Sequence, residues 1–101
     1  MVNTNYIGSI VKVLENPNQT VFNNTIPVTR FRVQFPQLRN TRIVNLIFWG
    51  NLALDVAKYY QVNDYILIEG YLSLKNKSHL KGNSKNVEIT VLKVYPFLLK
   101  K

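Results

Sequence analysis

The sequence predicts an all-β protein: a five-stranded Greek-key barrel with a short helix between its third and fourth strands. Two observations indicate strands, because hydrophobic and polar residues alternate with a period of two in 28–35 and again in 42–49. A third observation is the change to helical spacing directly afterwards, marked by Leu52 and Val56. We find no internal repeat and no linker-like segment, so one domain spanning 1–101 is expected.

Length and charge limit the classes of function. The chain has 101 residues, 47% of them hydrophobic, which suffices for one small core. Thirteen Lys and Arg against five Asp and Glu give a formal net charge of +8, which favours a polyanionic partner such as a phosphate backbone. No apolar run approaches the roughly 20 residues of a membrane-spanning helix, and no basic amphipathic helix indicates a membrane surface. The chain has no cysteine, so disulfides and thiolate metal sites are excluded.

The first half of the chain predicts three strands. Residues 6–14 are apolar and β-branched enough for the first, which is expected to end at the turn-forming residues 15–18. Residues 21–25 predict either a short strand or a wide turn. The alternating segments 28–35 and 42–49 are expected to pair as a hairpin.

The expected helix follows the third strand. Gly50 breaks that strand, and Asn51 is the predicted N-cap. Helical spacing continues for about two and a half turns, to Tyr59 or Tyr60. This helix is short and amphipathic.

Two further strands complete the fold. Residues 65–74 predict a long strand with a corner at Gly70, where the missing Cβ permits a sharp bend. The polar, basic segment 75–85 is expected to be a loop, and 87–94 the last strand. Three strands, a helix and two strands is the order of an OB-fold.

The two alternating strands also predict a binding face. If Phe31, Val33 and Phe35 fill the core with their counterparts in the next strand, the opposite face combines cations, amides and an indole. Cations suit phosphates, and aromatic rings suit unstacked bases. The residues expected on that face are Arg30, Arg32, Gln34, Ile43, Asn45, Ile47 and Trp49. The segment 75–85 is expected to add attraction that weakens with salt, through Lys75, Lys77, Lys81 and Lys85.

Several segments carry a family resemblance over nearly the whole chain. They are Val28-Thr29-Arg30-Phe31-Arg32-Val33, Phe48-Trp49-Gly50-Asn51-Leu52-Ala53, Ala57-Lys58-Tyr59, Val62-Asn63-Asp64 and Ile68-Glu69-Gly70-Tyr71-Leu72. They resemble the bacterial-type single-stranded-DNA-binding proteins, most closely the short, tail-less members of cyanobacteria and algal plastids. The resemblance implies an OB-fold that binds single-stranded DNA with little sequence specificity in replication, recombination or repair. It also implies that Trp49, just before the glycine, stacks on bases.

Two further expectations concern Tyr71 and the first strand. Tyr59, Tyr60, Tyr65 and Tyr71 are interpreted as packing residues around the helix and barrel, but Tyr71, near the glycine bend, is also a candidate to reach the groove. As in the oligomers of the family, the strand 6–14 is expected to pair or pack with that of a second copy, because it is apolar on both sides of its alternation. Dimer and tetramer both fit, and assembly would be tested at Tyr6, Ile10 and Val11.

The sequence departs from the family pattern in ways that predict weaker binding. Ile43 and the segment 75–77 stand where the family places other aromatic residues, and the loop 36–41 is short. The basic end of the chain, 96–101, is not the acidic tail through which family members recruit partners.

Other interpretations stay open. Trp49 could be a packing residue, Arg30 and Arg32 could solvate an exposed strand, and the lysines of 75–85 could be solubilising charge. An enzyme is not expected, because His79 is the only histidine, the acids are scattered and no glycine-rich phosphate loop is present, so no cofactor or metal is implied. The alternative function is a primosome-like adaptor that binds a protein partner and only weakly DNA or RNA; RNA is also an alternative ligand for the main hypothesis.

The expected location is a plastid, whose own genome would encode the protein, or the bacterial cytoplasm. Residues 1–6 lack the patterns of signal and transit peptides. Heavy use of Asn, Ile, Lys, Tyr and Phe is typical of AT-rich genomes.

Overall fold

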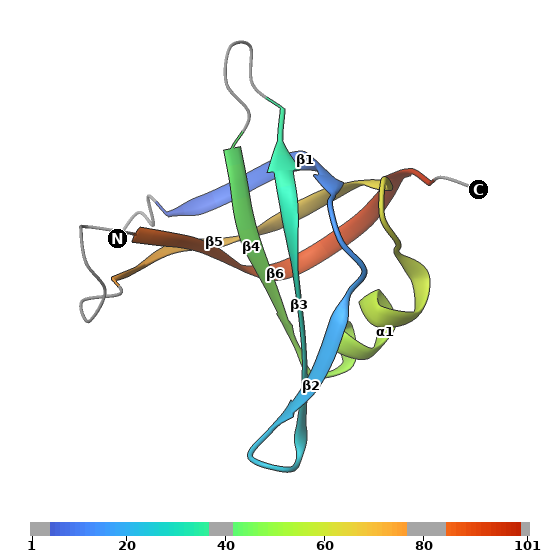
Figure 1. Cartoon of the computed structure of the whole chain (residues 1–101), viewed down its shortest axis with the longest axis vertical. Helices are drawn as coiled ribbons and strands as arrows, with labels where there is room; N and C mark the ends of the chain where they lie inside the picture. The colour runs from blue at the N-terminus through green and yellow to red at the C-terminus, as the bar shows by residue number, and fades with distance from the viewer. Residues whose placement is uncertain (1–4, 37–41, 77–84, 100–101) are drawn as a thin grey trace.

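The computed structural model describes residues 5–36, 42–76 and 85–99, which form six strands and one helix (Figure 1). In chain order the elements are β1 (Tyr6–Val13), β2 (Asn18–Phe22), β3 (Ile26–Phe35), β4 (Arg42–Trp49), α1 (Asn51–Tyr59), β5 (Tyr65–Asn76) and β6 (Lys85–Leu98). The sheet order is β1-β5-β6-β4-β3-β2, and β1 also pairs with β3. That pairing closes β1, β5, β6, β4 and β3 into a barrel. The predicted five-stranded OB-fold barrel, with its helix between the third and fourth barrel strands, is confirmed.

β1 and β2 follow one another along the same edge of β3. β1 reaches Val13 opposite Val33, and β2 begins at Asn18 opposite Arg30. The four residues 14–17 therefore face only two residues of β3, which makes this stretch a large bulge. A turn was expected at 15–18. The structure shows that the chain instead continues along the same edge of β3.

A tight turn joins β2 to β3. Asn23 and Asn24 have φ angles of 52° and 62°, and the Thr25 N–H donates to the Phe22 carbonyl at 3.1 Å. Positive φ at both central residues is the type I′ arrangement, which matches the twist of a hairpin and which asparagine tolerates. The segment 21–25 thus contains the end of a strand and a tight turn, where a short strand or a wide turn was expected.

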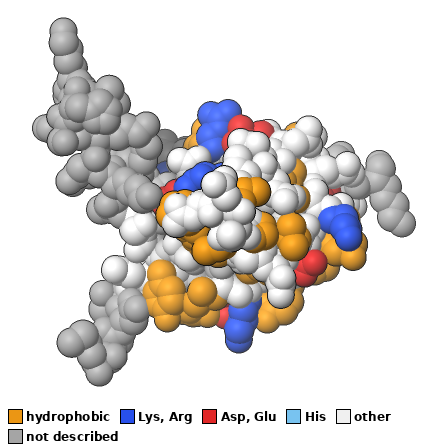
Figure 2. Space-filling model, turned by 90° about the horizontal axis from the view of Figure 1, so that it is seen from below, with side chains coloured by type: hydrophobic (Ala, Val, Ile, Leu, Met, Phe, Trp, Pro, Cys, Tyr) orange, Lys and Arg blue, Asp and Glu red, His pale blue; other side chains and the backbone are white. Residues whose placement is uncertain are grey.

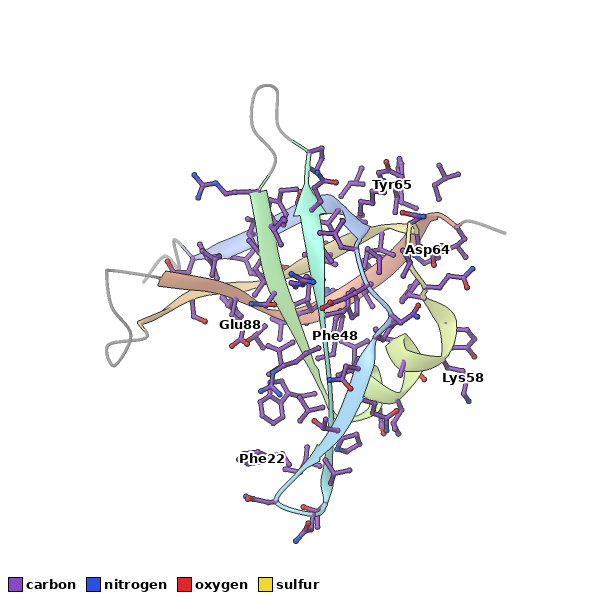
Figure 3. The ribbon with its side chains drawn as sticks, viewed as in Figure 1. Phe22, Phe48, Lys58, Asp64, Tyr65 and Glu88 are labelled. Atoms are coloured by element: carbon purple, nitrogen blue, oxygen red, sulfur yellow. The ribbon has the colours of Figure 1, made fainter. Side chains whose placement is uncertain are left out.

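Alternate residues of β3 and β4 fill the barrel, as their period predicts. Phe31 and Phe48 stack with ring centroids 5.2 Å apart, and Figure 3 shows Phe48 between the strands. The buried core comprises Val11, Val13, Phe31, Val33, Val44, Leu46, Phe48, Ala53, Val56, Ile66, Ile68, Ile89 and Val91. Val11, one of the positions named for testing assembly, belongs to this core with 0% exposure, so a substitution there would disturb the core.

The helix α1 begins one residue earlier than predicted. Gly50, with a φ of 67°, occupies the N-cap position without a side-chain cap hydrogen bond, and Asn51 is the first helical residue. Glycine adopts positive φ without strain, which lets the chain turn directly from β4 into the helix. Ala53 and Val56 are buried, and the Thr29 hydroxyl donates to the Ala53 carbonyl at 2.8 Å, which fixes α1 to β3. In the described part of the chain no helix is long and apolar enough to cross a membrane.

β5 and β6 extend beyond the expected 65–74 and 87–94, and β6 backbone leaves no room for a side chain at Gly70. A Cβ atom there would lie 2.1 Å from the Thr90 carbonyl oxygen. The pairing register shifts at this point, since Glu69 faces Lys93 while Gly70 faces Val91. The predicted corner therefore coincides with an irregularity in β6 that only a glycine opposite it can accommodate.

We expect Gly70→Ala to destabilise the fold by at least about 2 kcal/mol, because β6 backbone would have to move to admit the methyl group. Gly8→Ala is the matched control. Gly8 pairs with Glu69 on the neighbouring strand, and its added Cβ would meet only ordinary contacts at 3.7 Å. Urea denaturation followed by circular dichroism measures both. Equal stability of the two variants would contradict this account of Gly70.

Candidate nucleic-acid interface

Side chains that point away from the core on β2, β3, β4 and β6 form a continuous surface, which we call the outer face. Cross-strand pairing brings Arg30 opposite Ile47, Arg32 opposite Asn45, Gln34 opposite Ile43 and Val28 opposite Trp49. β6 adds Glu88 beside Asn45 and Thr90 beside Ile47. The structure therefore brings together on one face the residues predicted from the alternation of β3 and β4, namely Arg30, Arg32, Gln34, Ile43, Asn45, Ile47 and Trp49.

Trp49 is the exposed aromatic residue at the end of β4. Its side chain is 39% exposed and meets the ring of Phe22 edge to face, with centroids 5.6 Å apart and an interplanar angle of 82°. β2 and β4 flank β3, so their backbones lie about 10 Å apart at normal strand spacing. The two rings must therefore lean toward each other over β3. They cover Val28, the cross-strand neighbour of Trp49. Val28 lies outside the barrel core, and this cover explains why it is only 2% exposed.

Arg30 makes a similar crossing toward β6. Its Nε lies 4.0 Å from Glu88 Oε2, although β4 lies between the two strands. The arginine side chain consequently extends over Ile47, its cross-strand partner on β4. Figure 3 places Glu88 and Phe22 on the same side of the sheet, opposite Lys58.

The expectation that Ile47 is available for binding is wrong. Its side chain points to the outer face as expected, but Ile47 is only 2% exposed. The Arg30–Glu88 pair above it accounts for this burial. Ile47 and Val28 form an apolar floor beneath the outer face, and neither offers surface to a ligand. Ile43, near the other end of β4, is 56% exposed.

Arg32 is held by Glu15, a residue of the bulge between β1 and β2. Glu15 Oε1 lies 3.2 Å from both Nη2 and Nε of Arg32, and Glu15 Oε2 accepts the Arg32 backbone N–H at 2.8 Å. The bulge interrupts the β1–β3 ladder at this point, and the carboxylate supplies the missing acceptor. Glu15 is therefore both a backbone partner and a counterion.

These ion pairs change the expected electrostatics of the site. Within the described residues, Arg30 and Arg32 each lie within ion-pair distance of a glutamate. Their side chains remain 50% and 57% exposed, so water and a phosphate can still reach them. Glu15 is 39% exposed, and an ion pair exposed on both sides is worth about 0–1 kcal/mol. Glu88 is only 13% exposed, so water reaches the Arg30–Glu88 pair mainly from the arginine side. The outer face thus carries two partly exposed arginines, each already paired with a carboxylate.

Gln34 and Asn45 contribute amides and are partly buried. Lys75 lies in β5 with its backbone opposite Asn86. Lys77 and Lys81 lie outside the described residues. Among the described residues, no group of three or more His, Asp or Glu side chains could hold a metal ion.

Tyr71 lies on β5, where it pairs with Thr90, the β6 residue beside Ile47 on the outer face. It is separated from β4 by β6, and its ring meets that of Tyr6 on β1 with centroids 5.3 Å apart and an interplanar angle of 71°. The Tyr6 hydroxyl donates to the Glu69 carboxylate, and chiefly this hydrogen bond raises the pKa of Tyr6 to about 12. The hydroxyl is therefore a donor at any physiological pH. Tyr71 is joined to this tyrosine cluster and not to the aromatic pair of Trp49.

Comparison with known proteins identifies the family of this chain. No family model matches the chain. A protein of Trieres chinensis named "Putative single-stranded DNA-binding protein ycf41" is 38% identical over 102 residues, which covers 94% of this chain and 90% of the relative. The chain belongs to the single-stranded-DNA-binding protein family.

Solved structures of the family share the fold. The second single-stranded-DNA-binding protein of Mycobacterium smegmatis is 25% identical with a TM-score of 0.72, over 90% of this chain and 86% of that one. The SSB domain of a Synechococcus protein has a TM-score of 0.78 at 24% identity, over 94% and 98% of the two chains. The small single-stranded-DNA-binding protein of Streptomyces coelicolor has a TM-score of 0.79 at 17% identity, over 97% and 96%.

Three residues of the outer face were missed by sequence reasoning: Glu15, Phe22 and Glu88. Glu15 and Phe22 lie in segments that read as turns, and Glu88 is one acid within the last strand. The roles of these three residues depend on contacts with residues that are distant in the sequence. For Phe22, the available signal was the pair Asn23-Asn24, which is typical of a tight turn between two strands of a hairpin.

Proposed function

We propose that this protein binds single-stranded DNA with little sequence specificity through the outer face, as a non-enzymatic partner of replication, recombination or repair. The observation that carries the proposal is the exposed Trp49 at one end of a face that also carries Arg30 and Arg32, in a chain of this family. The name of the Trieres chinensis relative supports DNA over the adaptor alternative.

The proposed mechanism combines stacking with exchange of counterions. A base stacks on Trp49, which is worth about 1–3 kcal/mol and does not depend on base identity. Phosphates on either side replace Glu88 and Glu15 at the two arginines, and Gln34 and Asn45 offer amides to the strand. Lys75, Lys77 and Lys81 add attraction for the phosphate backbone as the strand passes the end of β5. Because none of these groups reads a base edge, specificity is low.

We also propose that two or more copies associate through β1. β5 pairs with one edge of β1 from Tyr6 to Lys12, and in the described residues β3 reaches the other edge only at Lys12 and Val13. The remaining length can accept a strand from a second copy. Beside it lie Tyr6 and Tyr71, 45% and 38% exposed, which offer an aromatic surface to the same partner.

A plastid is the proposed location, with a bacterial cytoplasm as the alternative. The designation ycf41 of the relative is that of a plastid-encoded protein and supports the first. The composition typical of an AT-rich genome agrees with it.

Titration with oligo-dT tests the proposed function directly, because Trp49 is the only tryptophan and reports on stacking. We expect strong quenching of its fluorescence, weaker at about 200 mM than at about 50 mM salt. Neutralisation of about four phosphates would give a logarithmic salt slope near −3. Absence of quenching together with no gel shift at low salt would reject DNA binding. A clear preference for oligo-U over oligo-dT would instead identify RNA as the ligand.

Glu88→Gln should tighten binding of oligo-dT by about two- to fivefold at low salt, because it removes the negative charge that is paired with Arg30. Asp55→Asn makes the same change of charge on the exposed side of α1 and should leave the affinity nearly unchanged. Fluorescence titration compares the two variants with the wild type. If Glu88→Gln binds more weakly, Glu88 positions Arg30 for the phosphate and does not compete with it.

Self-association is measured by sedimentation velocity. We expect the wild type to sediment as a dimer or tetramer and Ile10→Lys as a monomer with an unchanged circular dichroism spectrum. Ile10 lies on β1 opposite Leu67, away from the core. Val21→Lys places the same charge on the exposed β2 and should not alter the assembly. A monomeric wild type at high concentration would reject association through β1.

A further inference from the structure

We propose that Phe22 is a second base-stacking residue, which together with Trp49 forms an aromatic corner at the end of the outer face. This inference rests on the proposed function and extends it to a residue in the β2–β3 hairpin. The β2–β3 hairpin would then bind ligand as well as extend the sheet. Figure 2, which looks at the molecule from below, shows hydrophobic side chains on the surface beside charged ones at this end.

The position of Phe22 suits a stacking residue. Its side chain is 50% exposed, more than that of Trp49 at 39%, so both rings present surface to a ligand. Phe22 meets Trp49 over β3, which places it on the same face as Arg30. An exposed ring next to a cation is the combination that binds unstacked bases and their phosphates.

The ring of Phe22 is also held in place before any ligand arrives. β2 pairs with β3 along its whole length, and the type I′ turn directly follows Phe22. Val28 supports the aromatic pair from below and is 2% exposed. A side chain fixed in this way loses little conformational entropy when a base stacks on it, and this preorganisation favours binding.

The geometry of the pair predicts the shape of the bound strand. The two ring planes stand at 82°, so bases that stack on them cannot also stack on each other. Two neighbouring nucleotides would therefore be splayed apart at the corner, with the phosphate between them directed toward Arg30. A single strand can adopt this conformation, whereas a duplex would first have to lose its pairing and stacking.

Anisotropy of a labelled strand tests the proposal without depending on Trp49 fluorescence. We expect Phe22→Ala to weaken binding of oligo-dT by about 5- to 150-fold, the range that corresponds to about 1–3 kcal/mol for one lost stack. Phe22→Ala and the wild type should have equal affinity for an abasic strand of the same length, because that strand has no bases to stack. Val21→Ala is the matched control, because Val21 is the adjacent residue, is 57% exposed and points to the other side of β2.

Phe22→Leu separates stacking from packing, since leucine still covers Val28 but has no aromatic face. We expect Phe22→Leu to lose affinity for oligo-dT as Phe22→Ala does, with an unchanged circular dichroism spectrum. Wild-type affinity of Phe22→Leu, or equal losses on oligo-dT and on the abasic strand, would overturn the proposal. So would an effect of Val21→Ala equal to that of Phe22→Ala. If the wild type does not bind oligo-dT at all, the proposed function fails together with this inference; if it binds and Phe22→Ala is neutral, only this inference fails.

Discussion

Closure of the barrel along one edge of β3 is the constraint on which the rest of the structure depends. β1 and β2 share that edge, and β4 occupies the other, so β3 is paired on both sides. A slip of one residue would exchange Phe31 and Val33 for Arg30 and Arg32 in the core, which fixes the register strongly. The bulge between β1 and β2 would leave the Arg32 N–H without a strand partner, and Glu15 supplies the acceptor. The same closure thus determines both the core and the outer face.

The outer face that results differs from a simple cationic groove. It has an apolar floor, Val28 and Ile47, beneath one aromatic pair and one ion pair, each of which reaches across an intervening strand. The floor gives the covering side chains a defined position, and each of the two arginines lies within ion-pair distance of a glutamate. In the proposed function, stacking supplies much of the binding strength, and exchange of these counterions for phosphates makes binding sensitive to salt.

Sequence reasoning predicted the features that local periodicity determines. The bounds of β4, the inward residues of β3 and the corner at Gly70 could be predicted, because alternation and glycine act within a few residues. It failed for Ile47, because a period of two gives the side of the sheet but not the groups that cover that side. Phe22 was missed for a related reason: its contact with Trp49 exists only once β2, β3 and β4 are assembled. Asn51 was misassigned because the preceding glycine, with its positive φ, made a polar N-cap unnecessary.

Mapping of amide chemical shifts by NMR during addition of oligo-dT tests the central claim most directly, since it locates the ligand without altering the protein. The account predicts the largest shifts at the Trp49 indole N–H and at amides of β2, β3 and β4 around Phe22, Arg30 and Asn45. Shifts confined to the tyrosines of β1 and β5, with the Trp49 indole unchanged, would contradict it and would place the ligand away from the aromatic pair of Phe22 and Trp49.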